Sequence, residues 1–329
     1  MTDDLFRRPT RREFLTVGTG IFLVLSLPRA LRRRPPVSRR TVPLMGTIAE
    51  IQVAHPDERV AQAGLDAGIA ELQWVERTMT RFDPRSDIGR VNLGGARDGV
   101  RVSAETGLVI ERALLWASVT DGRFDPAIGE ASELWDVLHR RVPPPERQVR
   151  RLAGRGFWRK VDLTRDAAGA RVRLNDRDVH VDLGGIAKGY GIDRAVAAIR
   201  RLGIAHAIVT VGGDLYALGH APDGAPWEVG IRDPHHLDQL AGRLEVSDRA
   251  VTTSGDYERF FEYHGVRYHH LIDPVTAAPR RTGMHSATVV GANCFNADAA
   301  STAAFGLDRD TAQRMVRRVL GDAEVIPLT

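Results

Sequence analysis

The segment HVDLGGIAKGYGIDRA, residues 180–195, predicts a strand, a glycine turn and the start of a helix. Gly184 and Gly185 can adopt conformations closed to other residues and let a ligand approach the backbone. The following helix would direct amide N–H groups and a partial positive charge at the turn, which favours an anion. Lys188, about one turn into that helix, adds a point charge. The GxxxxGK[ST] and GxGxxG motifs are absent, and a helix start with an exposed lysine explains the segment equally well.

Strands and helices are mixed on both sides of this segment, as hydrophobic periodicity and turn residues indicate. Ser103 is typical of a helix N-cap, and a hairpin through His264–Gly265 joins FFEY to VRYHHLI. The predicted strands are 47–54, 171–174, 179–183, 207–211, 214–219, 227–231, 244–253 and 285–291. The predicted helices are 57–80, 104–119, 130–139, 186–202, 297–306 and 310–320. Because few strand–helix–strand units follow one another, we expect an α+β fold rather than a doubly wound sheet.

Composition and charge describe an ordinary globular chain with an unusual N-terminus. The 329 residues are 43% apolar and 27% charged, enough to bury a sizeable core. Residues 1–40 hold ten arginines against three acidic residues, a charge of +7, whereas the whole chain carries +4. The remaining residues are therefore mildly acidic, and their charge gives no indication of nucleic-acid binding.

The N-terminal residues 10–15, TRREFL, place twin arginines before Phe14 and Leu15, and an apolar run follows from Val17 to Leu27. This pattern resembles a twin-arginine export signal. The run has eleven residues, too few for the ~20 that span a bilayer. We therefore expect export through the twin-arginine machinery to the periplasm or the outer face of the membrane, with anchoring if the signal stays uncleaved. A basic tail with a chance apolar run is the alternative.

Residues 29–43 are charged, contain prolines and lack periodicity, so they predict a linker. We expect the signal and linker to occupy residues 1–40 and a single compact domain to occupy residues 41–329. Cys294 is the sole cysteine, which excludes an intrachain disulfide and a CxxC metal site and predicts a small buried side chain. Because no cysteine follows the apolar run, we expect no lipoprotein anchor.

Two oxygen donors lie four residues apart in NADAASTAAF, residues 296–305. Asp298 and Thr302 would share one face of a helix. A carboxylate and a hydroxyl are hard donors that suit Mg²⁺, with water and phosphate oxygens completing its coordination. A helix-start carboxylate and a threonine bonded to its own backbone would give the same pattern.

Two further turns carry polar residues. The segment VGGDLYALG, residues 211–219, places Asp214 after a second glycine turn, for which a tight hairpin is the plain interpretation. The segment DGRFDPAIGE, residues 121–130, places Phe124 beside two carboxylates. An aromatic ring next to hydrogen-bonding groups suits a flat ligand, and a solvated loop explains the segment equally well.

The segment VRYHHLIDPVT, residues 266–276, contains adjacent histidines followed by Asp273. Neighbouring side chains in a strand face opposite sides, so only one of His269 and His270 can enter a given site. Histidine can act there as an acid, a base or a phosphate ligand. A structural histidine is the alternative.

Taken together, these segments resemble the ApbE family, the FAD:protein FMN transferases. The matching segments, in family order, are LMGT (44–47), RFDPRSDIGRVN (81–92), DGRFDPAIG (121–129), VDLGGIAKGYGIDRA (181–195), VGGDLYALG (211–219), TTSGDYERFF (252–261), YHHLIDPVT (268–276) and ADAASTAAF (297–305). Each matching segment is weak evidence alone. Eight segments in the family's order over about residues 44–307 make a chance match improbable.

The resemblance implies an ApbE-like fold related to the T-fold, with mixed sheets and packed helices in one catalytic domain. It also implies that FAD binds in a cleft with Mg²⁺ on its diphosphate. The implied metal ligands are the side chains of Asp298 and Thr302 and the backbone carbonyl of Gly185. The implied FAD contacts are Met45, Phe82, Arg123, Phe124, Asp125, Asp182, Lys188 and His270.

Family members move the FMN half of FAD onto a threonine or serine hydroxyl of an acceptor protein and release AMP. The resemblance therefore implies an exported or membrane-bound acceptor protein as a partner. Lys188 and the glycine-turn amides would stabilise the transferring oxygens. Our hypothesis for the base near the acceptor hydroxyl is His270, with Asp273 fixing its position or tautomer.

Three positions depart from the family pattern. Phe82 stands where many relatives have tyrosine, Ala277 replaces the usual glycine of a DPxTG turn, and Gly185 is alanine or serine in some relatives. We expect the turn at Ala277 to differ in shape. A Mg²⁺-dependent FAD pyrophosphatase, giving FMN and AMP, and a non-catalytic exported flavin-binding protein remain as alternatives. The intact pair of Asp298 and Thr302 argues against the second.

Overall fold

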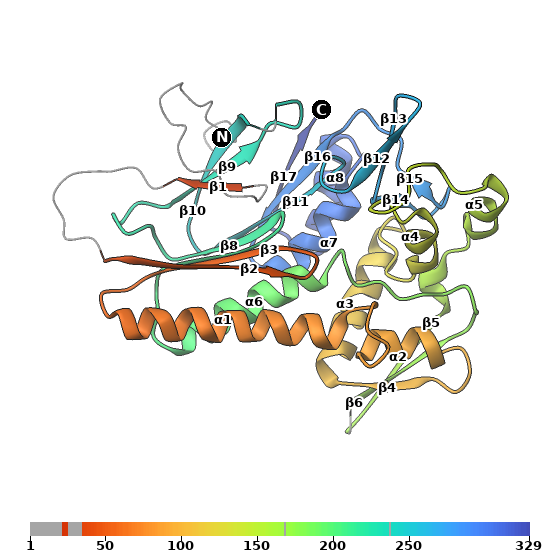
Figure 1. The fold of residues 1–329 in the computed structure, drawn as a ribbon, viewed down its shortest axis with the longest axis horizontal. Coiled ribbons are helices and arrows are strands. Elements are labelled where there is room, and N and C mark those ends of the chain that lie inside the picture. Colours follow the sequence, from red (N-terminus) through yellow and green to blue (C-terminus); the bar gives the residue numbers. More distant parts are fainter. Residues whose placement is uncertain (1–21, 26–34, 168, 237) are drawn as a thin grey trace. The chain divides into compact units, whose positions relative to one another are not determined.

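The structure is a computed structural model, and it describes residues 22–25, 35–167, 169–236 and 238–329. These residues form helices and several sheets, which confirms the predicted α+β class (Figure 1). The chain forms two compact units, each assembled from separated stretches of sequence. The first unit comprises Met1–Trp74, Lys188–Thr253 and Val289–Ala297, and the second comprises Val75–Ala187, Ser254–Thr288 and Asp298–Thr329.

The first unit is built on an antiparallel sheet in which the strand order is β11-β8-β7-β3-β2. Its strands are β2 (Val37–Leu44), β3 (Thr47–Ala54), β7 (Ala207–Val211), β8 (Asp214–Leu218) and β11 (Arg249–Gly255). A smaller antiparallel sheet has the order β1-β9-β10, with β1 (Phe22–Leu25), β9 (Trp227–Arg232) and β10 (Leu240–Val246). All five residues of β8 are buried, as expected of a central strand.

Two long helices, α1 (Glu58–Met79) and α6 (Ala187–Arg201), lie along one face of the larger sheet (Figure 1). Gly68 of α1 faces Ile51 of β3 and Ile199 of α6. A Cβ atom there would lie 2.6 Å from Ile51 Cδ1 of β3 and 3.3 Å from Ile199 Cδ1 of α6. A Cβ atom at Gly68 would crowd both isoleucines, so glycine lets α1 pack close to β3 and α6.

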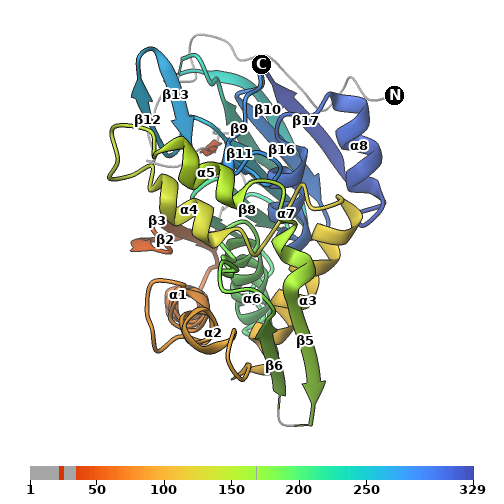
Figure 2. The same ribbon diagram turned by 90° about the vertical axis from the view of Figure 1, so that its right-hand side faces the viewer.

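The second unit combines short helices with small sheets. Its helices are α2 (Asp87–Gly94), α3 (Ala104–Val119), α4 (Gly129–Trp135), α5 (Glu146–Leu152), the 3₁₀ helix Phe157–Lys160, most of α7 (Cys294–Ala304) and α8 (Arg309–Arg317). Its strands are β4 (Val100–Val102), β5 (Val161–Asp166), β6 (Gly169–Leu174), β12 (Phe260–Tyr263), β13 (Val266–His269), β14 (Ile272–Asp273), β15 (Ala278–Pro279), part of β16 (Ser286–Gly291) and β17 (Glu324–Leu328). Figure 2 shows β5 and β6 paired beside α3.

Several local predictions are confirmed. Ser103 caps α3, because its hydroxyl accepts a hydrogen bond from the Thr106 amide at 3.2 Å. The hairpin β12–β13 turns at His264 and Gly265, both of which have positive φ. Cys294 is fully buried, and its thiol donates to the Leu215 carbonyl at 3.1 Å.

The strand predicted at 179–183 is wrong. Only His180 forms a bridge, to Ile128, and no strand is formed there. The side-chain amide of Asn92 replaces a neighbouring strand: it donates to the Val181 carbonyl at 3.0 Å and accepts from the Val181 amide at 2.7 Å. The backbone groups are thereby satisfied without a sheet.

Two other boundaries differ from the prediction. Residues 37–43, expected to be linker, form most of β2, which pairs with β3 over its full length. The single strand predicted at 244–253 is divided into the ends of β10 and β11 by a turn in which Asp248 has a φ of 54°. Aspartate tolerates this left-handed conformation better than most residues.

The predicted export signal lies mostly outside the described residues, including Arg11 and Arg12. Of its apolar run, the structure describes Phe22–Leu25, which pair with β9 as β1. Among the described residues, no helix has the length and apolar character needed to cross a membrane. The signal, its processing and the domain boundary at residue 41 stay predictions.

The turn at Ala277 keeps a conformation that suits glycine. Ala277 has a φ of 53° and is fully buried. Its amide donates to the Asp273 carbonyl at 2.7 Å, and its carbonyl accepts from Trp135 Nε1 at 2.8 Å. These contacts hold the alanine in the left-handed region, which costs an L-residue about 1–2 kcal/mol.

Ala277→Gly should therefore stabilise the protein. We expect the free energy of unfolding to rise by roughly 0.5–1 kcal/mol, because relief of strain exceeds the entropy that glycine adds to the unfolded chain. Urea unfolding measures the change, and Ala278→Gly in β15 is the control, since it should destabilise by roughly 0.5–1 kcal/mol. Equal destabilisation by both changes would contradict this account.

Candidate active site

The glycine turn lies against α7 in the second unit. A Cβ atom at Gly185 would lie 3.3 Å from Thr302 Oγ1 and 3.1 Å from Cε2 of the Phe124 ring. Asp298, one turn before Thr302 on α7, is buried, with 2% of its surface exposed. The structure therefore brings the turn that contains Gly185 next to Thr302, on the helix that also carries Asp298.

Hydroxyl groups surround Thr302. Ser254, at the end of β11, places its Oγ 3.2 Å from Thr302 Oγ1 and 2.9 Å from Ser301 Oγ. The Ser301 hydroxyl donates to the Asp298 carbonyl at 3.0 Å. These hydroxyl groups and the buried carboxylate of Asp298 on the same helix are oxygen donors of the kind that Mg²⁺, a hard cation, prefers. Sequence reasoning missed Ser254, because the TTSG segment matches the family without indicating a role.

Two arginines hold the C-terminal end of α7. Arg123 and Arg280 donate to carbonyls of its last turn, where the helix dipole is negative. The bonds are Arg123 Nε to Ala303 O (2.8 Å), Arg123 Nη2 to Phe305 O (2.6 Å), Arg280 Nη1 to Thr302 O (2.6 Å) and Arg280 Nη1 to Phe305 O (3.0 Å). Burial, together with Arg123, lowers the pKa of Arg280 to about 9, and Asp273 opposes that shift. The pair fixes the helix that carries Thr302, and contact of Arg123 with FAD stays a prediction.

Asp125 is a buried carboxylate beside Phe124. Its Oδ1 accepts from the Ala127 amide at 2.8 Å, and its Oδ2 accepts from the Trp158 amide at 3.3 Å. Burial raises its pKa to about 6, and the backbone hydrogen bonds oppose that shift. The carboxylate therefore joins its own loop to the 3₁₀ helix Phe157–Lys160, and its contact with FAD stays a prediction.

Lys188 is not a solvated surface residue. Its ammonium group forms an ion pair with Asp214, the first residue of β8, and their side chains are 23% and 1% exposed. A Cβ atom at Gly212 would lie 3.1 Å from Thr47 Oγ1, so the second glycine turn also contacts the hairpin between β2 and β3. Three segments that match the family thus meet within the first unit.

The tip of that hairpin is strained at a predicted FAD contact. Met45 and Gly46 have φ angles of 54° and 67°, the left-handed pair typical of a two-residue hairpin turn. Methionine is uncommon in this conformation. Strain of this kind often marks a functional position, which agrees with the prediction for Met45 without testing it.

Phe82 and Asp182 lie on either side of one arginine. Phe82 is 80% exposed, and the Arg81 guanidinium carbon lies 4.3 Å from the centroid of its ring. Asp182 forms an ion pair with Arg81 Nε at 3.1 Å and accepts from the Gly184 amide at 2.8 Å. Two predicted FAD contacts are therefore linked in the second unit.

The two adjacent histidines have different environments, because β13 ends at His269 and His270 lies just outside the strand. His269 is buried, and its Nε2 lies 2.9 Å from the Arg280 carbonyl. Burial lowers the pKa of His269 to about 4, so it is neutral and structural. His270 is half-buried, and its amide donates to the Arg259 carbonyl at 3.1 Å. The Asp273 carboxylate accepts from the Val275 amide at 2.8 Å, and its proposed action on His270 stays a prediction.

Comparison with known proteins identifies relatives over most of the chain. The ApbE family model matches residues 45–326. A FAD:protein FMN transferase of Treponema pallidum is 34% identical over 294 residues, covering 84% of this chain and 81% of the relative. One of Vibrio cholerae is 32% identical over 270 residues, covering 79% and 78%. The crystal structure of the ApbE protein of Thermotoga maritima is similar with a TM-score of 0.78 at 30% identity, covering 89% of this chain and 97% of that one.

Proposed function

The chain belongs to the ApbE family, and we propose on that premise that it is a Mg²⁺-dependent FAD:protein FMN transferase. It would attach FMN through a phosphoester bond to a threonine or serine of an acceptor protein and release AMP. The observation that carries this proposal is the contact between the Thr302 and Ser254 hydroxyl groups beside Gly185, on the helix that also carries the buried Asp298. The relatives bear the name FAD:protein FMN transferase, which supports transfer of FMN to a protein.

The proposed reaction is a displacement at phosphorus. The acceptor hydroxyl oxygen forms a bond to the phosphorus on the riboflavin side of FAD, and the bond from that phosphorus to the bridging oxygen breaks. AMP leaves with the bridging oxygen, and the hydroxyl proton passes to His270 as the proposed base. Asp298, Thr302 and the Gly185 carbonyl would hold Mg²⁺, which when bound neutralises charge on the diphosphate oxygens.

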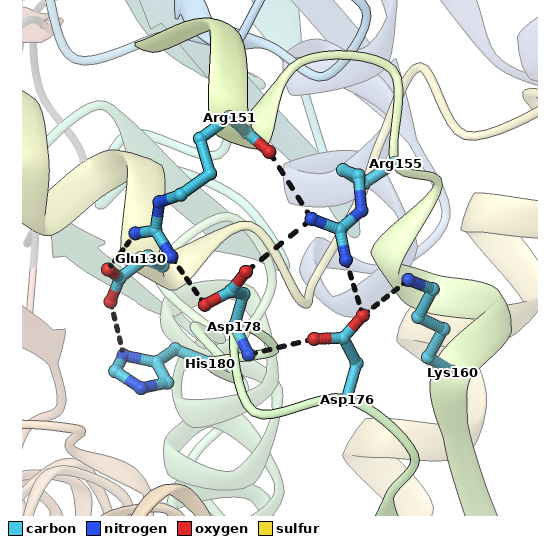
Figure 3. Close-up of polar contacts among 7 residues, drawn as sticks. All are labelled: Glu130, Arg151, Arg155, Lys160, Asp176, Asp178 and His180. Carbon is cyan, nitrogen blue, oxygen red and sulfur yellow. Dashed lines mark hydrogen bonds and ion pairs between the residues drawn. The ribbon is translucent and has the colours of Figure 1, made fainter. Parts of the chain in front are cut away.

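The positive charge of Lys188 and the N–H groups of the glycine turn suit the same diphosphate. Lys188→Ala should lower kcat/KM for FAD by roughly 100-fold, because charge developing on the phosphate oxygens loses a partner. Lys160 is a matched control: it is 29% exposed and pairs with Asp176 at 2.6 Å (Figure 3). Lys160→Ala should change kcat/KM by less than about threefold. Equal losses in both variants, measured as AMP release, would refute the assignment.

Hydrolysis and simple binding are the competing functions on the same site. A FAD pyrophosphatase would use water in place of the acceptor hydroxyl, and a storage protein would bind FAD without turnover. To distinguish these functions, the protein is incubated with FAD, Mg²⁺ and candidate exported acceptor proteins, and the mass of each acceptor is measured by mass spectrometry. An FMN-sized gain with AMP release supports transfer, free FMN alone supports hydrolysis, and neither supports binding only.

The proposed location follows from the N-terminal sequence. Twin arginines before an apolar run favour export by the twin-arginine machinery, so the acceptor would be exported or membrane-bound. Fractionation of cells that express the intact chain and an Arg11→Lys, Arg12→Lys double variant tests this location. Export is supported if the double variant stays in the cytoplasm while the unchanged chain leaves it. It is contradicted if both proteins are found in the same fractions.

A further inference from the structure

We propose that Arg81 is a positioning residue for FAD: it fixes the exposed Phe82 ring and the Asp182 carboxylate in one arrangement. The inference rests on the proposed function, in that FAD is taken as the ligand. Arg81 lies in the loop between α1 and α2, and its side chain is 13% exposed. An arginine so nearly buried is expected to be engaged through several of its donors.

Arg81 contacts three groups from three parts of the second unit. Its Nε pairs with Asp182 of the glycine turn at 3.1 Å, and its Nη1 pairs with Glu133 of α4 at 2.7 Å. The guanidinium carbon lies 4.3 Å from the centroid of the adjacent Phe82 ring. A planar guanidinium can stack its face on a ring and at the same time donate hydrogen bonds in its own plane. A lysine ammonium cannot do both.

Glu133, the second ion-pair partner of Arg81, is itself held by a neighbouring side chain. His180 Nδ1 lies 3.3 Å from Glu133 and 3.4 Å from Glu130, so one histidine links the two carboxylates. Figure 3 shows Glu130 held in turn by Arg151 at 2.9 Å, together with His180. Hydrogen bonding to Glu133 raises the pKa of His180. Glu133 is therefore a fixed support for Arg81.

The exposed ring explains why such support is needed. Phe82 is 80% exposed, so burial in the core does not orient it. A free phenyl ring would lose rotamer freedom on stacking against a flat ligand, and this loss weakens binding. With Arg81 stacked on one face, the ring is already fixed, and its other face can stack on an aromatic ring system of FAD. Asp182 is fixed by the same guanidinium and by the Gly184 amide.

The test separates FAD binding from turnover. Arg81→Gln should raise KM and the dissociation constant for FAD about tenfold, equivalent to about 1.4 kcal/mol, while kcat changes less than about twofold. Arg81→Lys should restore little of this loss, because it keeps the charge and loses the planar fork. Arg85→Gln is the matched control: Arg85 is four residues away, 89% exposed and paired with Asp83. It should bind FAD as the unchanged protein does.

A double-mutant cycle with Phe82→Ala tests the positioning role itself. If Arg81 acts through the ring, Phe82→Ala weakens FAD binding in the unchanged protein and costs clearly less in the Arg81→Gln background. Additive losses, full rescue by Arg81→Lys, or a loss in kcat alone would each overturn the proposal. Binding is followed by quenching of flavin fluorescence without an acceptor, so the result holds even if the protein hydrolyses FAD. If Arg81→Gln fails to fold, the same double-mutant cycle is measured with Arg81→Lys and Phe82→Ala, and its outcome tests the positioning role in the same way.

Discussion

Asp298→Ala should abolish Mg²⁺-dependent transfer, with AMP release falling by at least about 100-fold. The Asp298 carboxylate is the charged member of the proposed metal site and lies one turn from Thr302 on α7. It is 2% exposed, so bulk water cannot readily replace it as a ligand. Removal of the carboxylate leaves hydroxyl and carbonyl oxygens, which bind Mg²⁺ too weakly to hold it on the diphosphate.

The measurement pairs activity with metal binding. We expect Mn²⁺ titration, followed by electron paramagnetic resonance in the presence of FAD, to show one tight site in the unchanged protein and none after Asp298→Ala. Chelation by EDTA should stop the unchanged enzyme, and added Mg²⁺ should restore it. Asp310→Ala is the control, because Asp310 is an exposed carboxylate on α8. An Asp298→Ala protein that remains folded and active would refute the metal assignment.

Local sequence signals predicted the local structure well. The helix starting after Ser103 was located from its capping residue, and strand β3 was predicted over residues 47–54 from alternation alone. Both signals depend on neighbours within four residues, so the chain carries them without knowledge of the fold. The failed strand at 179–183 shows the limit, since the side chain that satisfies its backbone, Asn92, is 89 residues away.

The candidate site depends mostly on such distant contacts. Asp298 and Thr302 were predicted as a pair because four residues separate them on a helix. Ser254 was missed because it reaches Thr302 from a strand 48 residues away. The pairing of Lys188 with Asp214 was also absent from the prediction, although both glycine turns had been noted. The sequence identifies Lys188 and Asp214 separately, and only the folding of the first unit pairs their side chains.

The environment of Lys188 is a point that the residues alone leave open. Lys188 could equally have been an exposed helix-start lysine, and the structure decides that point by its ion pair with Asp214. The different shape expected of the turn at Ala277 stays a prediction, and the turn adopts a conformation that suits glycine. Ala277 has a positive φ, and hydrogen bonds to Asp273 and Trp135 hold it in that conformation.

His270→Ala should lower the transfer rate by about 10²–10⁴-fold while FAD still binds. An acceptor hydroxyl is a weak nucleophile until a base removes its proton during attack. His270 suits this role better than His269, because His269 is buried and occupied by backbone contacts. The two adjacent histidines differ in environment because His269 ends β13 and His270 follows it, and the role of His270 as the base stays a prediction.

The control and the pH profile make the assignment specific. His264→Ala removes an exposed histidine from the tip of the same hairpin and should leave transfer unchanged. If His270 is the base, its loss removes the acid limb of the pH–rate profile, whereas a purely structural role would lower the rate equally at every pH. A His270→Ala variant that binds FAD and keeps normal transfer rates would show that the base lies elsewhere. In that case the acceptor protein itself, which supplies the hydroxyl, is the next place to search for it.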